Sequence, residues 1–460
     1  MDNTLQTPLA DLRHSARPLS VNQARARILN EIQPVRGFER LALRSALDRV
    51  LAQDIVSPID VPSHTNSAVD GYALAGSALR ADGGEFRVAG TAWAGRPFTG
   101  GLAPDQCVRI MTGAPMPAGT DTVVMQEHVE MAGERVRIGA GHCVGLNVRA
   151  AGEDLARGEV AVAAGKRLTP AELGLLASIG SAEVNVFRRP RVAFFSTGDE
   201  LRSLGEPLGA GELYDSNRYT LYGMLARLNV EIIDMGVVRD ERDAVRDAFV
   251  QAGAIADAVV TSGGVSVGDA DYVKEVLTTI GNVSFWQIAM KPGRPLAFGH
   301  LDAVAGSHPA SVVDNREVRS RPLPSGTGDP APVFESASPC TTGATFFGLP
   351  GNPVAVMVTF YQFVQPALRR MAGEHTDAEP LTFRARCASR FNKRPGRTEF
   401  QRASLMRESD GTLVVRRTGQ QGSGILSSMA AANCFVVLPE AAAIIEPGTL
   451  VDVQPFFGLV

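Results

Sequence analysis

The sequence predicts a multidomain protein that combines an α/β domain, built on a doubly wound and mostly parallel sheet, with separate β-rich domains. Between Arg188 and Gly373, apolar strand-like runs alternate with amphipathic helical stretches, a pattern typical of βαβ units. On both sides of this region, short β-like runs are separated by Gly and Pro turns. With 460 residues the chain is also too long for a single hydrophobic core, so several domains are expected.

Composition and charge exclude several classes of protein. A net charge of −4 gives no basic field for nucleic acid, so no nucleic-acid partner is expected. The N-terminus has no apolar leader and no stretch approaches the length of a membrane span, so we expect no membrane partner and a cytoplasmic location. The five cysteines are scattered without C-x-x-C spacing, which favours reduced thiols.

Changes of pattern along the chain divide it into five parts. Capping boxes at Ser20–Gln23 and Thr169–Glu172 each predict the start of a helix, and Arg44–Asp54 is predicted to be helical as well. We expect a tail (1–19), a mixed helical N-terminal domain in two pieces (20–57 and 155–187), an inserted β-rich domain (58–154), the α/β domain (188–375), and a C-terminal β-domain, a barrel or a sandwich (376–460).

The α/β domain is predicted to contain strands at Val192–Ser196, Val230–Val238, Ala258–Thr261 and Phe285–Met290, and helices at Tyr219–Asn229, Asp240–Ala254, from near Asp271, and at Pro353–Met371. Ligands of such a sheet bind at the carboxyl ends of its strands. A segment at about 304–342 interrupts the domain without any hydrophobic period. Its central part, Ser307–Pro339, holds six Pro and six Ser, which predicts a flexible insertion.

The stretch Asp257–Tyr272 carries the strongest chemical signal. It opens as a buried strand, breaks at Gly263 and Gly264, and restarts as a helix near Asp271. Glycines before a helix N-terminus present N–H groups and the positive end of the helix dipole to an anion. The carboxylates of Asp269 and Asp271 would repel a phosphate in this loop unless a cation bridged them. The stretch therefore predicts a metal-assisted site for a phosphorylated ligand.

Three further segments follow strands and are expected at the same edge. Ser196–Glu200 is either a plain turn with a helix-capping acid or part of the site, and Asp240 alone is more often a helix N-cap than a ligand. Lys291–Pro295 places two cations, stiffened by prolines, where they suit a tetrahedral oxyanion, although a solvated basic turn is the alternative. Gly348–Pro353 either exposes backbone N–H groups to a ligand or only ends a strand and begins a helix.

The β-rich insert contributes weaker motifs at Asn66–Tyr72, Arg109–Pro115 and Arg149–Asp154. Its Asp70-Gly71 pair alone is a common turn signal. The histidines lack metal-ligand spacing, and the sequence contains no P-loop lysine pattern and no Ser–His–Asp elbow.

In combination, these motifs are more specific than any one of them. From Asn66–Tyr72 to Gly348–Pro353 they occur in the order found in the MoeA-type molybdopterin molybdenumtransferases, a family that includes the C-terminal part of gephyrin. The chain resembles this family from about Ser20 to Val460, apart from the insertion. The resemblance implies a homodimer of four-domain subunits, each with a doubly wound molybdopterin-binding domain like that of MogA and MoaB, a β-rich inserted domain, a small helical or mixed domain and a C-terminal β-barrel.

The resemblance also implies a reaction that completes molybdenum cofactor biosynthesis. Molybdenum from molybdate enters the dithiolene of adenylylated molybdopterin, the phosphoanhydride is hydrolysed, and AMP leaves with the help of Mg²⁺. The implied acids around the pyrophosphate and the metal are Glu200, Asp240 and Asp271. The implied catalytic residues of the β-rich domain are Asp70, Thr112 and Asp154. The implied ligand-binding residues are Arg149, Ser262, Gly263, Gly264, Ser266, Lys291, Arg294, Pro350, Gly351 and Asn352.

In the family, the β-rich domain faces the α/β domain of the partner subunit, so the resemblance implies a site shared across the dimer. Contact with the upstream molybdopterin adenylyltransferase is a further implied partnership. Weaker candidates for molybdate contacts in the C-terminal domain are Arg397, Arg402 and the Ser423–Ser428 stretch. Asp269 is interpreted as a loop or cap residue rather than a ligand.

The sequence departs from the family at three places. Gln287 and Arg294 stand where many members have Lys, and the insertion lengthens a connection that is usually short. Because Lys291–Pro295 and Gly348–Pro353 lie at one end of their strands, the insertion is predicted to lie away from the chemistry. Two other functions compete with the transferase: a nucleotide pyrophosphatase or adenylyltransferase on the same α/β domain, which needs neither β-domain, and a non-catalytic scaffold.

Overall fold

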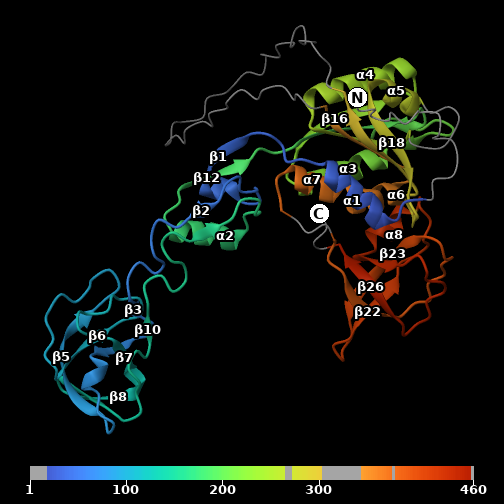
Figure 1. Ribbon diagram of the computed structural model, residues 1–460. Helices are drawn as coiled ribbons and strands as arrows, with labels where there is room; N and C mark the ends of the chain where they lie inside the picture. Colours follow the sequence, from blue (N-terminus) through green and yellow to red (C-terminus); the bar gives the residue numbers. More distant parts are fainter. Residues whose placement is uncertain (1–17, 265–271, 303–342, 376–378, 457–460) are drawn as a thin grey trace, which may run out of the picture. The chain divides into compact units, whose positions relative to one another are not determined.

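The computed structural model describes residues 18–264, 272–302, 343–375 and 379–456 (Figure 1). The chain divides into two compact units, one formed by residues up to Glu39 together with Phe187 onward, and the other by Arg40–Val186. The finer division into five parts remains a prediction. No helix in the described ranges has the length and apolarity needed to cross a membrane.

The larger unit is centred on a six-stranded sheet that confirms the predicted doubly wound fold. Its spatial order is β16 (Glu231–Val238), β13 (Arg191–Thr197), β17 (Ala258–Ser262), β21 (Thr345–Leu349), β20 (Pro295–Leu301) and β18 (Gly281–Gln287). The first four strands are mutually parallel, whereas β20 is antiparallel to both of its neighbours. The register is level at the carboxyl edge, where Ser262 lies between Ser196 and Leu349.

Helices cover both faces of this sheet (Figure 1). On one face lie α4 (Arg242–Ile255) and α5 (Tyr272–Ile280), and on the other lie α1 (Val21–Glu31), α3 (Ser216–Arg227), α6 (Pro353–Thr359) and α7 (Gln365–Met371). Side chains of β13 alternate between the two cores: Val192 and Phe194 pack with the second group, and Ala193 and Phe195 pack with the first. Apolar burial on both faces explains why these strands read as continuous hydrophobic runs.

The last long helix is interrupted where α1 docks on it. The predicted helix Pro353–Met371 contains a π-helical turn, η5 (Phe360–Val364), between α6 and α7. The buried Arg25 of α1 donates from Nε to the Gln362 carbonyl at 3.1 Å and from Nη2 to the Gln362 side chain at 2.6 Å. A widened turn exposes backbone carbonyls that a regular helix would use internally, so the π-helical turn provides an acceptor for Arg25.

The predicted helix at Arg44–Asp54 is wrong. Only Leu43–Ala46 forms a 3₁₀ turn, η2, and the chain then reverses at Asp48, whose φ is +60°. Beyond that point Val50 and Leu51 form antiparallel bridges to Arg167 and Val186. Pairing with two distant segments therefore overrides the local helical preference of this stretch.

The smaller unit contains the elements predicted for the insert and its flanks. Both capping boxes are present, the one at Ser20–Gln23 in the larger unit and the one at Thr169–Glu172 before α2 (Pro170–Ser178) in this unit. The main sheet runs in the order β7 (Thr122–Met125), β4 (Gly71–Leu74), β6 (Gln106–Ile110), β5 (Gly84–Ala92), β9 (Arg135–Ile138) and β8 (Val129–Ala132). Three two-stranded sheets join β1 (Phe38–Ala42) to β12 (Glu183–Phe187), β2 (Ile55–Val56) to β11 (Val160–Val162), and β3 (Asn66–Ser67) to β10 (Val148–Arg149). Two short 3₁₀ turns are η3 (Gly76–Ala78) and η4 (Gln126–His128).

The C-terminal domain is a barrel, which decides between the two predicted β-architectures. Strands β23 (Thr398–Arg407), β24 (Leu413–Arg417), β22 (Phe383–Cys387), β26 (Leu450–Pro455) and β25 (Cys434–Leu438) pair in that order, and β25 closes back on β23. A short helix, α8 (Leu426–Ala430), lies between β24 and β25. The two-residue strand β19 (Met290–Lys291) pairs with β23 and links this barrel to the α/β domain.

The insertion begins and ends at the amino-terminal edge of the parallel strands. Leu301 closes β20 and donates its backbone N–H to the Ala344 carbonyl at 2.8 Å, and His300 pairs with Thr345. The insertion itself lies outside the described residues. Its two attachment points are at the edge opposite the one where Pro295 and Leu349 lie.

A buried ion pair holds that amino-terminal edge together. Asp257, directly before β17, accepts hydrogen bonds from Nη1 and Nη2 of Arg188, both at 2.7 Å, and from the backbone N–H of Arg191 at 2.7 Å. Its side chain is only 6% exposed. Burial alone would raise the pKa of Asp257, but these donors outweigh it and hold the pKa below its ordinary value.

We expect Asp257→Asn to lower the free energy of unfolding at pH 7 by roughly 2–4 kcal/mol, because it removes the carboxylate to which the largely buried Arg188 donates. Since folding lowers the pKa of Asp257, its contribution is complete above the unfolded-state pKa and is lost as the pH falls through the folded-state value. Urea unfolding should therefore give a constant difference between the two proteins near neutral pH, which shrinks below about pH 4.

The matched control is Asp243→Asn on α4, where an exposed carboxylate lies 3.2 Å from Arg246. An exposed pair of this kind contributes little, so this change should cost less than about 0.5 kcal/mol. An equal cost for the two variants would contradict the role assigned to Asp257.

Candidate functional site

Four loops leave the carboxyl edge of the parallel strands and form the candidate site. They follow β13 at Thr197, β16 at Val238, β17 at Ser262 and β21 at Leu349. The connection between β18 and β20 lies at the same edge, because Gln287 pairs with Pro295. The predicted loops of the α/β domain, as far as the structure describes them, therefore all lie at one edge of the sheet.

Three acids lie close to one another at this edge. The backbone N–H of Asp240 donates to Oδ1 of Asp199 at 3.2 Å, which joins the loop after β16 to the loop after β13. Burial, followed by the negative charges of Asp199 and Glu200, raises the pKa of Asp240. Neither alternative interpretation as a helix cap holds, because β14 (Leu201–Arg202) follows Glu200 and Glu241 is the N-cap of α4.

The backbone of this loop holds Glu200 in place. Gly198 has a φ of +148°, and a Cβ atom there would lie 2.6 Å from Oε2 of Glu200, so the carboxylate folds back over its own loop. The carbonyl of Glu200 accepts from Leu213 of β15 (Leu213–Tyr214), the parallel partner of β14. An ion pair between Arg202 and Glu212 closes the same short ribbon.

These acids fit the chemistry of a magnesium ion. Mg²⁺ prefers carboxylate and water oxygens, and a divalent cation would offset both the burial of Asp240, which is the main cause of its raised pKa, and the smaller effect of the charges of Asp199 and Glu200. The third expected ligand, Asp271, lies outside the described residues, as does Asp269. Within the part of the chain that the structure describes, no three His, Cys, Asp or Glu side chains form a group that could hold a metal. The roles of Glu200 and Asp240 as metal ligands therefore remain a prediction.

The glycines after β17 form a tightly packed turn. Gly263 and Gly264 have φ values of +91° and +65°. A Cβ atom at Gly263 would lie 2.8 Å from the Thr197 carbonyl, and one at Gly264 would lie 2.3 Å from Val273 of α5. Side chains are therefore excluded at both positions. The backbone N–H of Gly263 donates to the Leu349 carbonyl at 3.1 Å, which ties the turn to the end of β21. Ser266, the fourth predicted member of this cradle, lies outside the described residues.

The Ser262 side chain faces the interior. It is 2% exposed, and its hydroxyl lies 3.2 Å from the buried hydroxyl of Ser196 on the neighbouring strand. In this structure Ser262 therefore links β17 to β13 and leaves the exposed part of the turn to the two glycines.

The loop after β21 packs directly on that turn. A Cβ atom at Gly351 would lie 3.9 Å from Cα of Gly263, and Asn352 is the N-cap of α6 with Pro353 at the first helical position. The carbonyl of Gly351 accepts from Nδ2 of Asn217, on α3, at 2.7 Å. Sequence reasoning missed Asn217, although its polar side chain in the first turn of an amphipathic helix was the available signal.

The predicted basic pair is divided between two partners. Arg294 donates from Nη2 to Oε1 of Gln287 at 2.8 Å, so the residue that replaces the family's lysine aligns a cation instead of adding one. Lys291 lies 3.8 Å from the buried carboxylate of Glu399 in the barrel. Lys291 and Arg294 therefore both lie at the edge, each beside an oxygen acceptor.

Arg402, a weaker molybdate candidate, is fully engaged in this structure. Its side chain is 1% exposed and donates to the carbonyls of Gln420, Gln421 and Gly422 and to the Ser428 hydroxyl. Burial lowers its pKa to about 10. The segment that it holds continues to Ser423, whose carbonyl accepts from the backbone N–H of Val354 at 3.0 Å. Arg402 thus braces the start of α6 from the barrel.

A second cluster lies in the smaller unit. Oδ1 of Asp70 accepts from the backbone N–H of Thr112 at 2.8 Å and from its hydroxyl at 2.7 Å. These two bonds, the backbone bond first, lower the pKa of Asp70. Both residues are exposed, so a polar pair is built on the surface where β4 begins and β6 ends. Arg149 and Asp154 are also exposed, on β10 and the turn that follows it.

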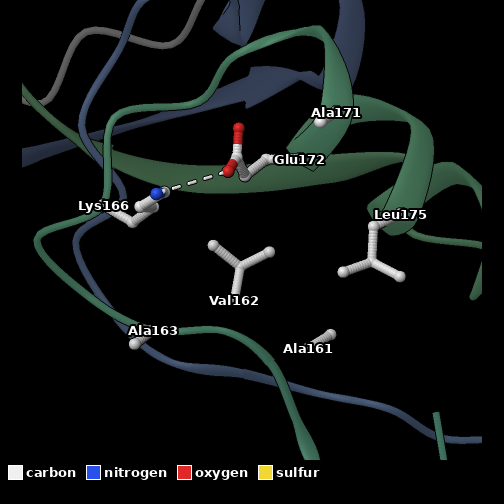
Figure 2. A pocket seen from close by; sticks show the side chains of 7 residues that line it. All are labelled: Ala161, Val162, Ala163, Lys166, Ala171, Glu172 and Leu175. Carbon is white, nitrogen blue, oxygen red and sulfur yellow. Dashed lines mark ion pairs between the residues drawn. The ribbon is translucent and has the colours of Figure 1, made fainter. Parts of the chain in front are cut away.

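A hollow in the smaller unit does not coincide with either cluster. It measures about 260 Å³, and its lining is mostly apolar: Ala161, Val162, Ala163, Lys166, Ala171, Glu172 and Leu175 (Figure 2). Its two charged residues pair with each other at 3.5 Å. This hollow lacks the unpaired charge that a phosphate or molybdate would need.

Comparison with known proteins agrees with this geometry. Family profiles match for the MoeA N-terminal region (domain I and II) at residues 19–180, a probable molybdopterin binding domain at 193–370, and the MoeA C-terminal region (domain IV) at 384–456. A molybdopterin molybdenumtransferase of Haemophilus influenzae is 39% identical over 95% of this chain and 98% of its own length. One from a Nostoc species is 35% identical over 89% and 87%, respectively.

A solved structure and a further relative by sequence support the same family. A molybdopterin biosynthesis moeA protein from Pyrococcus horikoshii matches 95% of this chain and 100% of its own, with a TM-score of 0.73 and 25% identity. Gephyrin of Dictyostelium discoideum is 32% identical over 90% of this chain, which spans 59% of that longer protein. The family profiles together span most of the chain, and the closely matched relatives are aligned over nearly their full length. The chain therefore belongs to the MoeA family.

Proposed function

We propose that this protein is a molybdopterin molybdenumtransferase, which inserts molybdenum from molybdate into adenylylated molybdopterin and releases AMP. The observation that carries the proposal is the gathering of Glu200, Asp240, the Gly263–Gly264 turn and two basic residues at one sheet edge. The names of the relatives in Haemophilus influenzae and Nostoc support the same reaction. Such an edge offers both of the things the reaction requires, acids for a metal and donors for anions.

The chemical task is to bring two anions together. Molybdate and a pyrophosphate-bearing pterin repel each other, so cations and backbone N–H groups must offset their charge. The glycine turn suits the phosphates, and Lys291 and Arg294 suit the oxyanion. Each thiol of the dithiolene gives up its proton as its sulfur bonds to molybdenum, and an oxygen of molybdate leaves with these protons as water. Water also cleaves the phosphoanhydride, and AMP departs.

Glu200 and Asp240, together with Asp271, would hold Mg²⁺ beside the anhydride. When held there, Mg²⁺ would supply positive charge that offsets the negative charge of the phosphates. The acids alone would repel the phosphates, so their role is to hold the cation, and the turn formed by Gly263 and Gly264 would lie beside the phosphates. Arg294, aligned by Gln287, would face the molybdate oxygens.

The proposal includes a homodimer with a shared site and a contact with the upstream adenylyltransferase. Asp70, Thr112, Arg149 and Asp154 would come from the β-rich domain of the partner subunit. Their exposure supports this role, because a polar cluster on a surface can act on a ligand held by another chain.

Given adenylylated molybdopterin, molybdate and Mg²⁺, the purified protein should release AMP, and Glu200→Gln or Asp240→Asn should slow release by about 100-fold or more. Each change removes one negative oxygen ligand while keeping shape and volume. AMP is measured by chromatography at several Mg²⁺ concentrations, and the variants should need more Mg²⁺ than the unmodified protein.

Glu231→Gln is the matched control, since Glu231 is exposed at the opposite end of β16. Its rate should stay within about twofold of the original, as expected for a surface change away from the site. Release of no AMP by the unmodified protein would refute the proposed reaction, and normal rates in both edge variants would refute the assigned roles.

We expect Thr112→Val to raise the pKa of Asp70 towards its ordinary value, because the variant loses the hydroxyl donor and keeps the backbone donor. The charged form of Asp70 is then favoured only at higher pH, so the acidic limb of the rate profile should move upward. Carbon-13 NMR titration of labelled aspartate measures the pKa directly. Thr120→Val, which removes a hydroxyl bonded to the Pro117 carbonyl, should leave that titration unchanged.

Replacement of residues 307–339 by a short turn should leave AMP release within about twofold, because the insertion is attached at the edge opposite the acids. Shortening this connection should also raise the free energy of unfolding by roughly 1–2 kcal/mol, because a shorter loop costs less entropy to close. Loss of activity in a variant that unfolds at the same temperature or higher would show that the insertion takes part in the chemistry.

A further inference from the structure

Strand β23 buries polar side chains in an unusual number for a barrel strand. Glu399, Gln401 and Arg402 follow one another closely, and each is no more than 6% exposed. Residues 399 and 401 share one face of the strand, and Arg402 lies on the other. Because an isolated buried carboxylate is costly, Glu399 must have partners that offset its burial.

Glu399 is surrounded by three side chains from different segments. Oε2 accepts a hydrogen bond from Nε2 of Gln401 at 3.0 Å and lies 3.8 Å from Nζ of Lys291. Oε1 lies 3.7 Å from Nε of Arg397. Lys291 reaches it from β19, which pairs residue for residue with β23, so Lys291 and Glu399 are directly opposite each other. One carboxylate thus joins a cation of the α/β domain to a cation of the barrel.

Glu399 attracts the two cations without occupying their hydrogen-bond donors. Distances of 3.7 and 3.8 Å give electrostatic attraction but exceed hydrogen-bond length, so the N–H groups can still donate to another acceptor. Both side chains are more than a third exposed, whereas the carboxylate is 3% exposed. The nearby Lys393 differs, because its Nζ already donates to three backbone carbonyls. Lys291 and Arg397 are therefore partly exposed to solvent, and both lie beside the buried carboxylate of Glu399.

We propose that Glu399 is a positioning residue that holds Lys291 and Arg397 together as one receptor for the tetrahedral oxyanion substrate. This assignment rests on the proposed function, under which that oxyanion is molybdate. Without the carboxylate, the two cations repel each other and move apart into solvent, and an incoming dianion must gather them again. With it, they are in place before the substrate arrives, which reduces the ordering cost of binding.

The test is calorimetric titration of the full-length protein with molybdate alone. Glu399→Gln should raise the dissociation constant by about tenfold or more, which corresponds to loss of alignment for charge-assisted hydrogen bonds. Glu399→Asp keeps the carboxylate and should recover part of the affinity. In the full reaction, Glu399→Gln should raise the KM for molybdate while changing the KM for adenylylated molybdopterin by less than about twofold.

Glu408→Gln is the control, because Glu408 also pairs with an arginine of the barrel, Arg416 at 3.2 Å, but in an exposed position. It should leave the molybdate affinity unchanged. If Glu399→Gln does not fold, Arg397→Gln replaces it, since its side chain is 39% exposed and should be tolerated. That variant should weaken molybdate binding to a similar degree, and combining it with Glu399→Asp should cause no further loss.

Unchanged or tighter molybdate binding in a folded Glu399→Gln protein would overturn the proposal, because the carboxylate would then only offset positive charge. A parallel rise in both KM values would overturn it as well, since that pattern indicates a general structural defect. The titration needs no pterin and no turnover. A protein that binds molybdate in a Glu399-dependent way but releases no AMP would support this inference while refuting the proposed reaction.

Discussion

The level register of the parallel strands is the constraint on which the candidate site depends. Ser196, Ser262 and Leu349 lie side by side at the ends of β13, β17 and β21, so the loops that follow start from one line. A slip of one residue would turn Ser196 and Ser262 towards opposite layers and move the Gly263 turn away from Thr197. Register is set by apolar side chains that alternate between two cores, and position at the edge follows from it.

The two edges of the sheet divide stability and chemistry between them. At the amino-terminal edge, Asp257 is matched with Arg188 and with the backbone of Arg191, so burial of its charge is compensated. At the carboxyl edge, burial and then repulsion from the charges of Asp199 and Glu200 raise the pKa of Asp240. A fold can keep such repulsion at one edge because the other edge and the two helical layers supply the cooperative stability.

Much of this arrangement could be predicted from the sequence, since periodicity and capping motifs report local structure. The strand predicted at Ala258–Thr261 agrees with β17 to within one residue, and the helix that begins at Pro170 starts where its capping box predicts. Arg44–Asp54 failed because its pairing partners lie more than a hundred residues away, where no local pattern can indicate them. Asn217 was missed because its place in the first turn of a helix was only a weak signal, and the Gly351 carbonyl that accepts its hydrogen bond lies in a distant loop.

The site residues differ in predictability according to what makes them functional. Glu200 and Asp240 could be proposed because both follow strands of a parallel sheet, whose ligands bind at the carboxyl ends of the strands, although either acid could also have capped a helix. Glu399 gives no such signal: in the sequence it is one charged residue in a β-strand, and its burial becomes visible only when the barrel closes.

The electrostatics of the two halves of the site are complementary rather than alike. At the strand edge, burial and the nearby charges of Asp199 and Glu200 disfavour the charged form of Asp240, which a divalent cation would favour. The cations opposite Glu399 are instead gathered by a buried anion that leaves their donors available. The acids at the strand edge thus favour a cation, and Lys291 and Arg397 favour an anion. The proposed reaction, between a metal-bound pyrophosphate and an oxyanion, requires both kinds of group. The acids repel the oxyanion, and the two basic residues repel the metal ion. The charges that favour binding of each ligand therefore also direct it to its own position.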